Sequence, residues 1–266
     1  MAAARLTGRA LLTAIEYAVV LDCDAKCPKC SAGKMMTCLD ERLTHEQIRA
    51  LADDTIRLGA YEVNFTGGEP TLDDRLEDIV SYFHPDETFL GLNTHGGHLT
   101  PERIRRLADA GLDLFKISLD APTAEEHDRS RGLPGLFRLV MDALDVIGET
   151  SGVRAHLCVT ARKELIDSGD LARCVDLAKS KNATVGLILP SAISRWQNHH
   201  EVLLEEKQRR ALDAAAKDPD IFLQANVGGP FECPCGVTEI YVSCYGDVLA
   251  CPLHSDFVGE YSRGTF

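Results

Sequence analysis

Three closely spaced cysteines are the first residues of this sequence that could do chemistry. Cys23, Cys27 and Cys30 are separated by three and by two residues in the segment CDAKCPKC. Thiolates are preferred ligands of iron–sulfur clusters, and one short loop can hold three corners of a cubane while the fourth iron stays open. A structural zinc site needs four ligands, and Cys38 could supply a fourth only across a longer loop. The spacing therefore indicates a cluster, with a zinc site and three unrelated thiols as alternatives.

Another motif follows an apolar run that we expect to be a strand. The segment TGGEP at residues 66–70 comes directly after the run 61–65. Its two glycines would let the backbone approach a ligand closely. The carboxylate of Glu69 could then pair with an ammonium group at the carboxyl ends of the strands. An ordinary turn with a capping glutamate is the alternative.

A third motif closes the apolar run 114–119. Ser118 lies at the end of this run, and Arg131 follows in the segment HDRSR. A hydroxyl and a guanidinium can together hold a carboxylate, with the arginine as a bidentate partner. Turn formation is the alternative role for Ser118 and for Asp120.

A second group of cysteines lies in the segment FECPCGVTEIYVSCYGDVLACP. Two apolar runs on either side of its YGD sequence predict a β-hairpin. Four thiols could form a complete site for an auxiliary iron–sulfur cluster, and a zinc ribbon is the alternative. Cys158 and Cys174 instead fall in an expected strand and an expected helix, where buried structural thiols are common. The second group consists of Cys233, Cys235, Cys244 and Cys251.

The elements that must position these residues alternate between strand-like apolar runs and helical patterns. Such an alternation predicts an α/β protein with a parallel sheet covered by helices. Because the polar motifs follow the strands, we expect a partial (β/α)6 TIM-like barrel with its active site at the carboxyl ends of the strands. An open, doubly wound sheet is the alternative. The expected strands are 16–21, 61–65, 89–92, 114–119, 153–160 and 184–189, and the main expected helices are 44–59, 100–111, 136–147 and 171–179.

The pattern changes after residue 190, which predicts a boundary near residue 200. Residues 1–200 would form the barrel. Residues 201–266 would form a helix, at 201–216, followed by a small cysteine-rich β-hairpin module.

The net charge and the length of the apolar runs exclude some classes of partner. With 41 acidic and 28 basic side chains the formal net charge is -13, which would repel a phosphate backbone, so we expect no nucleic-acid partner. No apolar run reaches the roughly 18 residues of a membrane span, and the first residues lack the apolar core of a secretion signal. We therefore expect a cytoplasmic protein with no membrane partner, whose cysteines serve as ligands rather than disulfides.

Together the motifs resemble the radical S-adenosylmethionine (radical SAM) superfamily, from about residue 16 to about residue 190. The resemblance implies that the first three cysteines bind a [4Fe–4S] cluster and that Glu69 contacts the methionyl ammonium of S-adenosylmethionine. Ser118 and Arg131 match positions that contact the ribose and the methionyl carboxylate in similar enzymes. Two departures are His95, where the family usually has asparagine, and Lys29, where it usually has an aromatic residue. The implied cofactor-binding residues are Gly67, Gly68, Glu69, Pro70, Ser118 and Arg131.

The tail resembles the opening half of the SPASM and twitch modules, which bind auxiliary iron–sulfur clusters. Cys235, Gly246 and Cys251 carry this resemblance. The second half of the longer pattern does not follow in the sequence, so a shortened, twitch-like module is expected. Cys235 and Cys251 are the firmer pair of ligands, and Cys244 is a candidate hydrogen donor.

The resemblance also implies a reaction. S-adenosylmethionine would be cleaved reductively, with an electron donor such as flavodoxin or ferredoxin, to a 5'-deoxyadenosyl radical that abstracts hydrogen from a small polar substrate. A sugar or aminocyclitol of a natural-product pathway is the expected substrate, and dehydrogenation and epimerisation are both open. The first alternative is a peptide maturase of the same superfamily, although only about 15 residues precede the first strand. The second is a zinc or iron–sulfur protein without catalytic activity.

Overall fold

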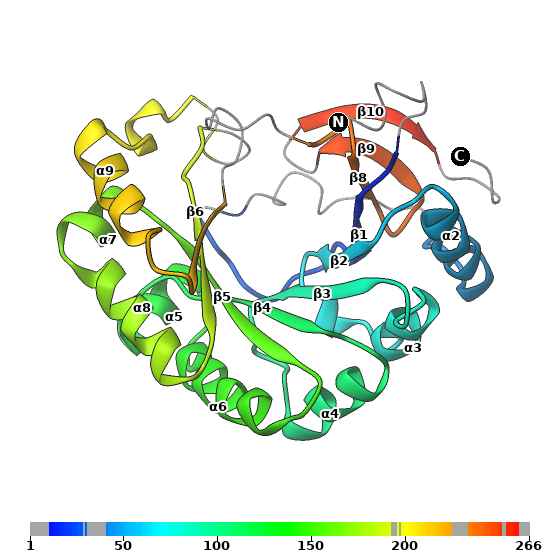
Figure 1. Cartoon of the computed structure of the whole chain (residues 1–266), viewed down its shortest axis with the longest axis horizontal. Helices are drawn as coiled ribbons and strands as arrows, with labels where there is room; N and C mark the ends of the chain where they lie inside the picture. The colour runs from blue at the N-terminus through cyan, green and yellow to red at the C-terminus, as the bar shows by residue number, and fades with distance from the viewer. Residues whose placement is uncertain are drawn as a thin grey trace.

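One curled sheet organises the molecule (Figure 1). The computed structural model describes residues 11–28, 30, 41–192, 196, 198–224 and 234–251, together with the backbone of 254–260. The strands follow the order β10-β9-β8-β1-β2-β3-β4-β5-β6-β7. Adjacent strands from β8 through β1 to β7 are parallel. The pairs β8–β9 and β9–β10 are antiparallel. The strands are β1 Ala14–Val20, β2 Glu62–Gly67, β3 Phe89–Thr94, β4 Leu114–Ser118, β5 Arg154–Thr160, β6 Thr184–Ile188, β7 Ile221–Gln224, β8 Glu239–Val242, β9 Asp247–Cys251 and β10 His254–Glu260.

Helices cover the convex side of this sheet, which gives the partial barrel expected from the sequence (Figure 1). In the part of the chain that the structure describes, no helix combines the length and the apolar character needed to cross a membrane. The α-helices are α2 His45–Arg57, α3 Leu76–Tyr82, α4 Pro101–Asp109, α5 Ala124–Arg131, α6 Leu136–Glu149, α7 Lys163–Asp167, α8 Asp170–Ser180 and α9 Glu206–Ala215.

The side chains of each strand alternate between the helical layer and the concave face. On β1, Ile15 and Tyr17 are buried in the main core, which also contains Ile48 and Leu51 of α2. Ala18 belongs instead to a small second apolar cluster. Because successive strand residues point to opposite faces, Glu16 shares the concave face with Ala18.

Local helix signals are confirmed where the sequence predicts them. Thr44 and Gln47 form a capping box at the start of α2. Thr100 caps α4 through the backbone N–H of Arg103, and Pro101 occupies its first turn. These caps set the residues at which α2 and α4 begin.

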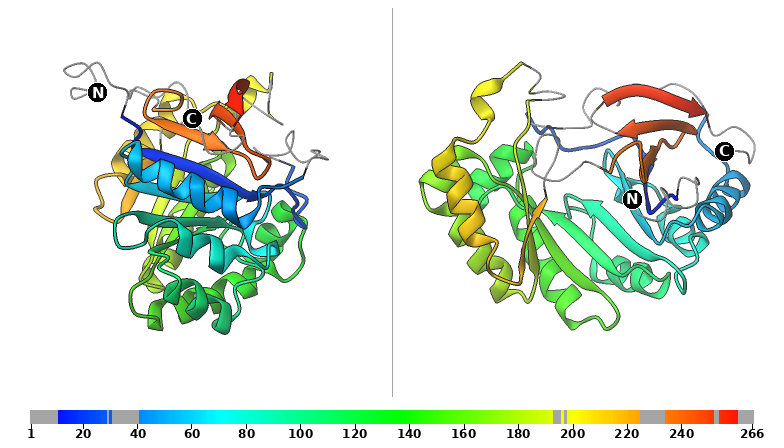
Figure 2. Two further views of the ribbon diagram at one scale, coloured as in Figure 1. Left: turned by 90° about the vertical axis from the view of Figure 1, so that its right-hand side faces the viewer. Right: turned by 45° about the horizontal axis from the view of Figure 1, so that its top comes forward.

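The sheet extends beyond the six expected strands at both edges. Figure 2 shows β8, β9 and β10 continuing its curve past β1. The predicted hairpin is present as β8 and β9, with Tyr241 opposite Leu249. Strand β7 and the short helices α5 and α7 were not expected, because each is too short for a clear hydrophobic period. The domain boundary near residue 200 stays a prediction, and described strands from both sides of it share the one sheet.

Candidate active site

The loop after β1 carries the three cysteines. Cys27 is buried, whereas Cys23 and Cys30 are partly exposed. The backbone N–H of Cys30 donates to the carbonyl of Cys27 over 3.3 Å, and that of Lys26 donates to the carbonyl of Arg131 over 2.8 Å. The loop is thus held against the end of α5.

Gly67 and Gly68 both lie directly against the loop that follows β1. A Cβ on Gly67 would lie 2.0 Å from the carbonyl oxygen of Val20, and one on Gly68 would lie 2.1 Å from that of Asp22. The N–H of Gly68 donates to Val20, and the N–H of Glu69 donates to Asp22, each over 2.8 Å. The glycines therefore let two loops hydrogen-bond in direct contact.

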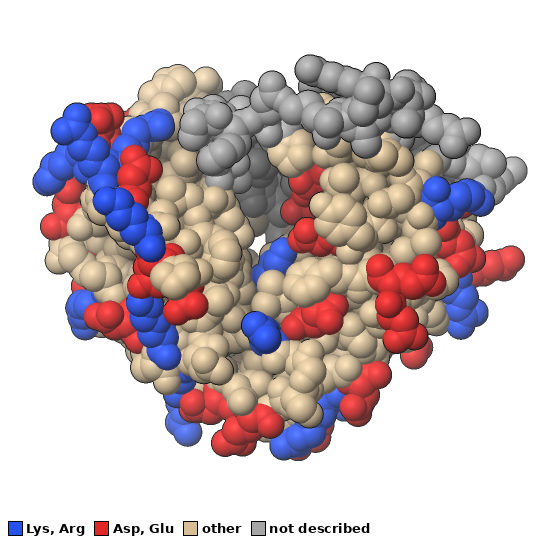
Figure 3. Space-filling view, viewed as in Figure 1, with Lys and Arg blue, Asp and Glu red and all other residues tan. Residues whose placement is uncertain are grey.

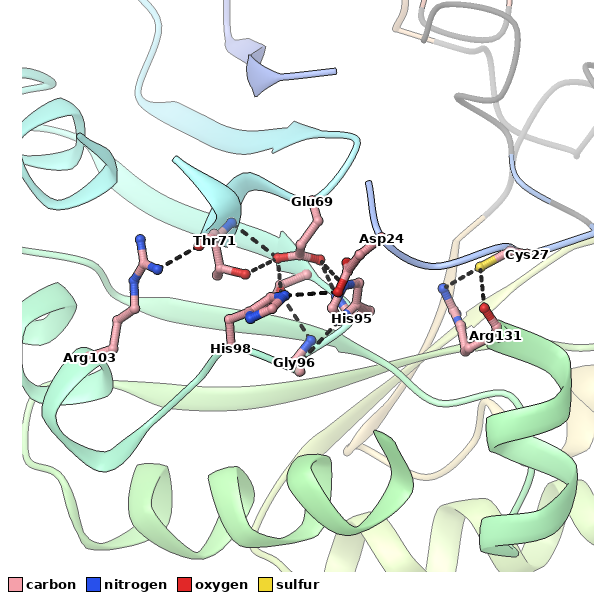
Figure 4. A network of polar contacts seen from close by, with 11 residues as sticks. Asp24, Cys27, Glu69, Thr71, His95, Gly96, His98, Arg103 and Arg131 are labelled. Carbon is pink, nitrogen blue, oxygen red and sulfur yellow. Dashed lines mark hydrogen bonds and ion pairs between the residues drawn. The ribbon is translucent and has the colours of Figure 1, made fainter. Parts of the chain in front are cut away.

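Glu69 lies in a pocket of hydrogen-bond donors at the carboxyl ends of β2 and β3 (Figure 4). Its side chain is buried, with 1% exposed. Its Oε1 accepts from the Thr71 N–H at 3.1 Å, the Thr71 hydroxyl at 2.5 Å and the Thr94 hydroxyl at 2.6 Å. Its Oε2 accepts from the backbone N–H of His95 at 2.8 Å. Pro70 begins the short 3-10 helix Pro70–Leu72, which brings Thr71 under the carboxylate.

The His95 imidazole connects this carboxylate to the cysteine loop. Its Nδ1 accepts from the backbone N–H of Gly97 at 3.0 Å, so the neutral ring carries its proton on Nε2. Nε2 lies 2.9 Å from Oδ1 of Asp24 and 3.4 Å from Oε2 of Glu69. His98 contacts the other oxygen of Asp24 at 3.0 Å. Burial raises the pKa of Asp24, but hydrogen bonds from the two histidines outweigh burial and leave it below the usual value.

Cys23 belongs to the same cluster of groups. The ligand atoms of Cys23, Asp24 and His95 all lie within 4.8 Å of one another, and the sulfurs of Cys27 and Cys30 are not part of this group. Burial, followed by the charges of Glu69 and Asp24, raises the pKa of the Cys23 thiol to about 11. Because a metal binds the thiolate, metal binding must displace this proton.

Arg131 is fixed beside Cys27 by a buried carboxylate. Its Nη2 donates to Oδ1 of Asp120 at 3.0 Å, and its Nε lies 2.7 Å from Oδ2. Asp120 is 0% exposed and also accepts from the Ser130 hydroxyl at 3.0 Å. The remaining nitrogen, Nη1, lies 3.8 Å from the Cys27 sulfur. Asp120 is thus the partner that orients the arginine, a role that its place in a turn did not reveal.

Ser118 ends β4 directly opposite Cys158 of β5. The backbone register places both side chains on the concave face, since Lys116 of the same strand reaches Asn64 there. Among the described residues, the Ser118 hydroxyl has no hydrogen-bond partner. The structure therefore brings Ser118 to the mouth of the barrel, without a hydrogen bond to Arg131.

The C-terminal cysteines lie at opposite ends of the hairpin. Cys244 lies in the turn between β8 and β9, packed with Ala18 and Leu21, and burial raises the pKa of its thiol to about 11. Cys251 ends β9, and Cys235 pairs with Glu239 at the start of β8. Cys233 lies outside the described residues. The hairpin thus separates Cys244 from Cys235 and Cys251.

Comparisons with known proteins give relatives over most of the chain. A family model described as "Radical SAM superfamily" matches residues 17–162. Mycofactocin maturase MftC of Mycolicibacterium smegmatis is 26% identical over 256 residues, which cover 89% of this chain and 64% of that protein. AdoMet-dependent heme synthase of Nitratidesulfovibrio vulgaris is 25% identical over 154 residues, covering 58% and 42%. The chain thus spans less than two thirds of the length of these curated relatives.

Solved structures share the fold at low sequence identity. Streptococcus suis SuiB bound to precursor peptide SuiA has a TM-score of 0.76 and 11% identity, over 99% of this chain and 66% of that one. The complex of BtrN with AdoMet and 2-DOIA has a TM-score of 0.51 and 16% identity, over 95% and 79%. These likenesses describe the arrangement of strands and helices.

Proposed function

The chain belongs to the radical SAM superfamily, whose members use a [4Fe–4S] cluster and S-adenosylmethionine, and on this premise we propose that it modifies a peptide by hydrogen abstraction. When bound, the cluster supplies the electron that cleaves S-adenosylmethionine into methionine and a 5'-deoxyadenosyl radical, which takes a hydrogen atom from the substrate. The contact between the cysteine loop and the Glu69 pocket is the observation that carries the radical chemistry of this proposal.

Cys23, Cys27 and Cys30 are the proposed cluster ligands. One loop presents all three thiols, and the sulfurs are not gathered within the distance that a single ion demands. Ligands of separate irons have this freedom, whereas four sulfurs about 2.3 Å from one zinc ion do not. The Arg131 guanidinium lies beside Cys27, with Nη1 3.8 Å from its sulfur.

Glu69 is the proposed acceptor for the methionyl ammonium. Its Oε1 already accepts three hydrogen bonds, whereas Oε2 accepts one short hydrogen bond, from His95. A carboxylate offers about four lone-pair sites, so Oε2 retains capacity for a further donor. Thr71, Thr94 and His95 together hold the carboxylate in place, which reduces the reorganisation needed when the ligand binds.

Arg131 and Ser118 are the proposed contacts for the rest of S-adenosylmethionine. Asp120 occupies two nitrogens of Arg131 and leaves Nη1, next to Cys27, for the methionyl carboxylate. Ser118 offers a hydroxyl with no described partner at the end of β4, suited to the ribose. These two contacts would orient the sulfonium toward the cluster.

The substrate proposal differs from the small polar metabolite expected from the sequence. MftC, named a maturase, aligns with 89% of this chain, and SuiB, whose fold is shared, was solved with a precursor peptide. Both support the peptide alternative better than a sugar or aminocyclitol. A second iron–sulfur cluster near Cys235 and Cys251 is also proposed, as the electron acceptor.

Anaerobic reconstitution followed by reduction tests the first step. The wild type should convert S-adenosylmethionine to 5'-deoxyadenosine, and Cys27→Ala should lower this rate at least 100-fold. Cys174→Ala removes a buried thiol on α8 and serves as the matched control, with cleavage retained. Undiminished cleavage by Cys27→Ala would refute the ligand assignment.

A further inference from the structure

Three carboxylates share the concave face of the sheet near one edge. Glu16 of β1 is in register with Asn64 of β2 and with Tyr241 of β8, and Ala14 is in register with Glu62 and Glu239. Residues in register on parallel strands point to the same face, and positions two apart do so as well. The carboxylates of Glu16, Glu62 and Glu239 therefore face the interior of the barrel, away from the helices.

One lysine faces these carboxylates, and it is already paired. Lys116 of β4 donates to Oδ1 of Asn64 at 2.5 Å and lies 3.4 Å from Oε1 of Glu62. Glycine at position 91 permits this reach, because a Cβ there would lie 2.7 Å from the Asn64 amide oxygen and 3.2 Å from Cε of Lys116. Within the described part of the chain, neither Glu16 nor the Glu239 side chain has a hydrogen bond or an ion pair.

A buried hydroxyl on the same face also lacks a partner. Tyr241 is 2% exposed, and its hydroxyl makes no hydrogen bond to any described residue. Its register with Glu16 places the ring beside that carboxylate. A buried hydroxyl is normally satisfied, so its lack of a partner beside two unpaired carboxylates indicates a ligand that supplies donors.

The electrostatics of this face agree with a cationic ligand. Burial, and next the charge of Glu239, raises the pKa of Glu16 to about 7, although Lys116 opposes the shift. A positive charge beside Glu16 would favour its ionised form.

A cavity of about 1130 Å³ opens along the lower part of the barrel and reaches this face at Glu62 and Lys116. Glu16, Glu239 and Tyr241 are not among the residues that line it. Figure 3 shows a hollow in the middle of the molecule with acidic and basic groups along its sides. Glu16 lies four residues below Val20, roughly 13 Å along the strand, so a group bound here anchors the substrate beneath the reacting centre.

We propose that Glu16, Glu239 and Tyr241 bind a protonated amine or guanidinium of the substrate. The two carboxylates supply charge and the hydroxyl accepts a further N–H. This inference rests on the proposed function and deepens it by naming the chemistry of the substrate. The cation comes from a lysine or arginine side chain of a peptide, or from an amino group of a small metabolite.

The test is ligand-observed NMR of the reconstituted full chain at pH 8, without reductant, with n-butylammonium as the probe and n-pentanol as its neutral analogue. We expect the ammonium to bind and pentanol to bind at least 5-fold more weakly. Glu16→Gln and Glu239→Gln should each weaken ammonium binding at least 5-fold. Glu149→Gln, the same change at an exposed position on α6, should leave it unchanged.

Tyr241→Phe provides a second variant, since it removes only a hydroxyl without a described partner and should fold as stably as the wild type. It should weaken ammonium binding about 3-fold. Equal affinities across the wild type and all three interior variants, or no binding to the wild type, overturn the proposal.

Competition identifies the source of the cation. N-acetyl-lysine methylamide displaces the probe if the substrate is a peptide, with its norleucine analogue as the control. The aminocyclitol 2-deoxystreptamine displaces it if the substrate is a small metabolite, with an inositol as the control. Failure of both amines to compete overturns the assignment to substrate. Because no turnover is required, these results are independent of S-adenosylmethionine cleavage, which tests the proposed function separately.

Discussion

Nε2 of His95 lies 2.9 Å from Oδ1 of Asp24, so that the turn after β3 is hydrogen-bonded to the cysteine loop after β1. The ring also accepts from Gly97, which fixes it as a donor toward Asp24. A residue that departs from the family pattern therefore joins the proposed cluster loop to the Glu69 pocket.

Replacing this histidine should loosen that connection. His95→Asn restores the usual family residue but is too short to accept from Gly97 and reach Asp24 together. We expect S-adenosylmethionine cleavage to fall about 10-fold and the Kd for S-adenosylmethionine to rise, measured by 5'-deoxyadenosine formation and by calorimetry. His84→Asn is the matched control, because His84 pairs at the surface with Asp53 and asparagine tolerates its positive φ. Equal effects of both changes would contradict a specific role.

Two glycine substitutions should have opposite effects on stability. Gly68→Ala would place a methyl group 2.1 Å from the carbonyl oxygen of Asp22, which forces the two loops apart, and should cost several kcal/mol and abolish cluster binding. Gly148→Ala, on α6 with open space around it, should stabilise the fold by about 0.5–1 kcal/mol. Chemical denaturation and iron analysis measure both. A harmless Gly68→Ala would contradict the loop contact.

The buried ion pair should matter more than an exposed one. Asp120→Asn leaves the Arg131 guanidinium without its carboxylate, and breaking such a buried pair costs about 3 kcal/mol or more. Glu125→Gln removes the exposed partner of Arg129 and should change the free energy of unfolding by less than about 0.5 kcal/mol. Urea unfolding compares the two, and similar losses would argue against Asp120 as the residue that orients Arg131.

Stability should decrease in mild acid because of His156. Burial, followed by the charge of Lys116, lowers the pKa of this histidine from 6.5 to about 4. The unfolded chain therefore binds a proton first as the pH falls, so the stability is complete above pH 6.5 and is lost between pH 6.5 and pH 4. Between pH 7 and pH 5 the wild type should lose about 2 kcal/mol that His156→Asn does not lose. If the histidine were not responsible, denaturation curves would show the wild type and His156→Asn losing the same free energy of unfolding between the two pH values.

Iron content should show which C-terminal cysteines help to hold a second cluster. If Cys251 helps to hold a second cluster, the reconstituted wild type binds about eight irons and Cys251→Ser about four. Cys244→Ser should keep the wild-type content, because the hairpin places this residue at the opposite end from Cys251. Bound zinc in place of the additional iron would favour a zinc ribbon, and a loss of iron in Cys244→Ser would contradict the separation.

Local patterns in the sequence were enough to predict the repeating unit and the motifs. Hydrophobic periodicity and helix caps are local, so the six central strands and the caps at Thr44 and Thr100 could be predicted from the residues between them. Cysteine spacing and the glycine pair are local as well, which is why the cluster loop and Glu69 were identifiable.

Which residues meet across strands depends on the folded arrangement and could not be predicted locally. Nothing near Asp120 in the sequence marks it as the buried partner of Arg131, because the pairing depends on how α5 packs back onto the end of β4. Likewise, Glu16 and Tyr241 share a face only because β8 pairs with β1, although they lie 225 positions apart in the chain. Periodicity tells which face of a strand is apolar, but strand order and register decide which polar groups meet on the other face.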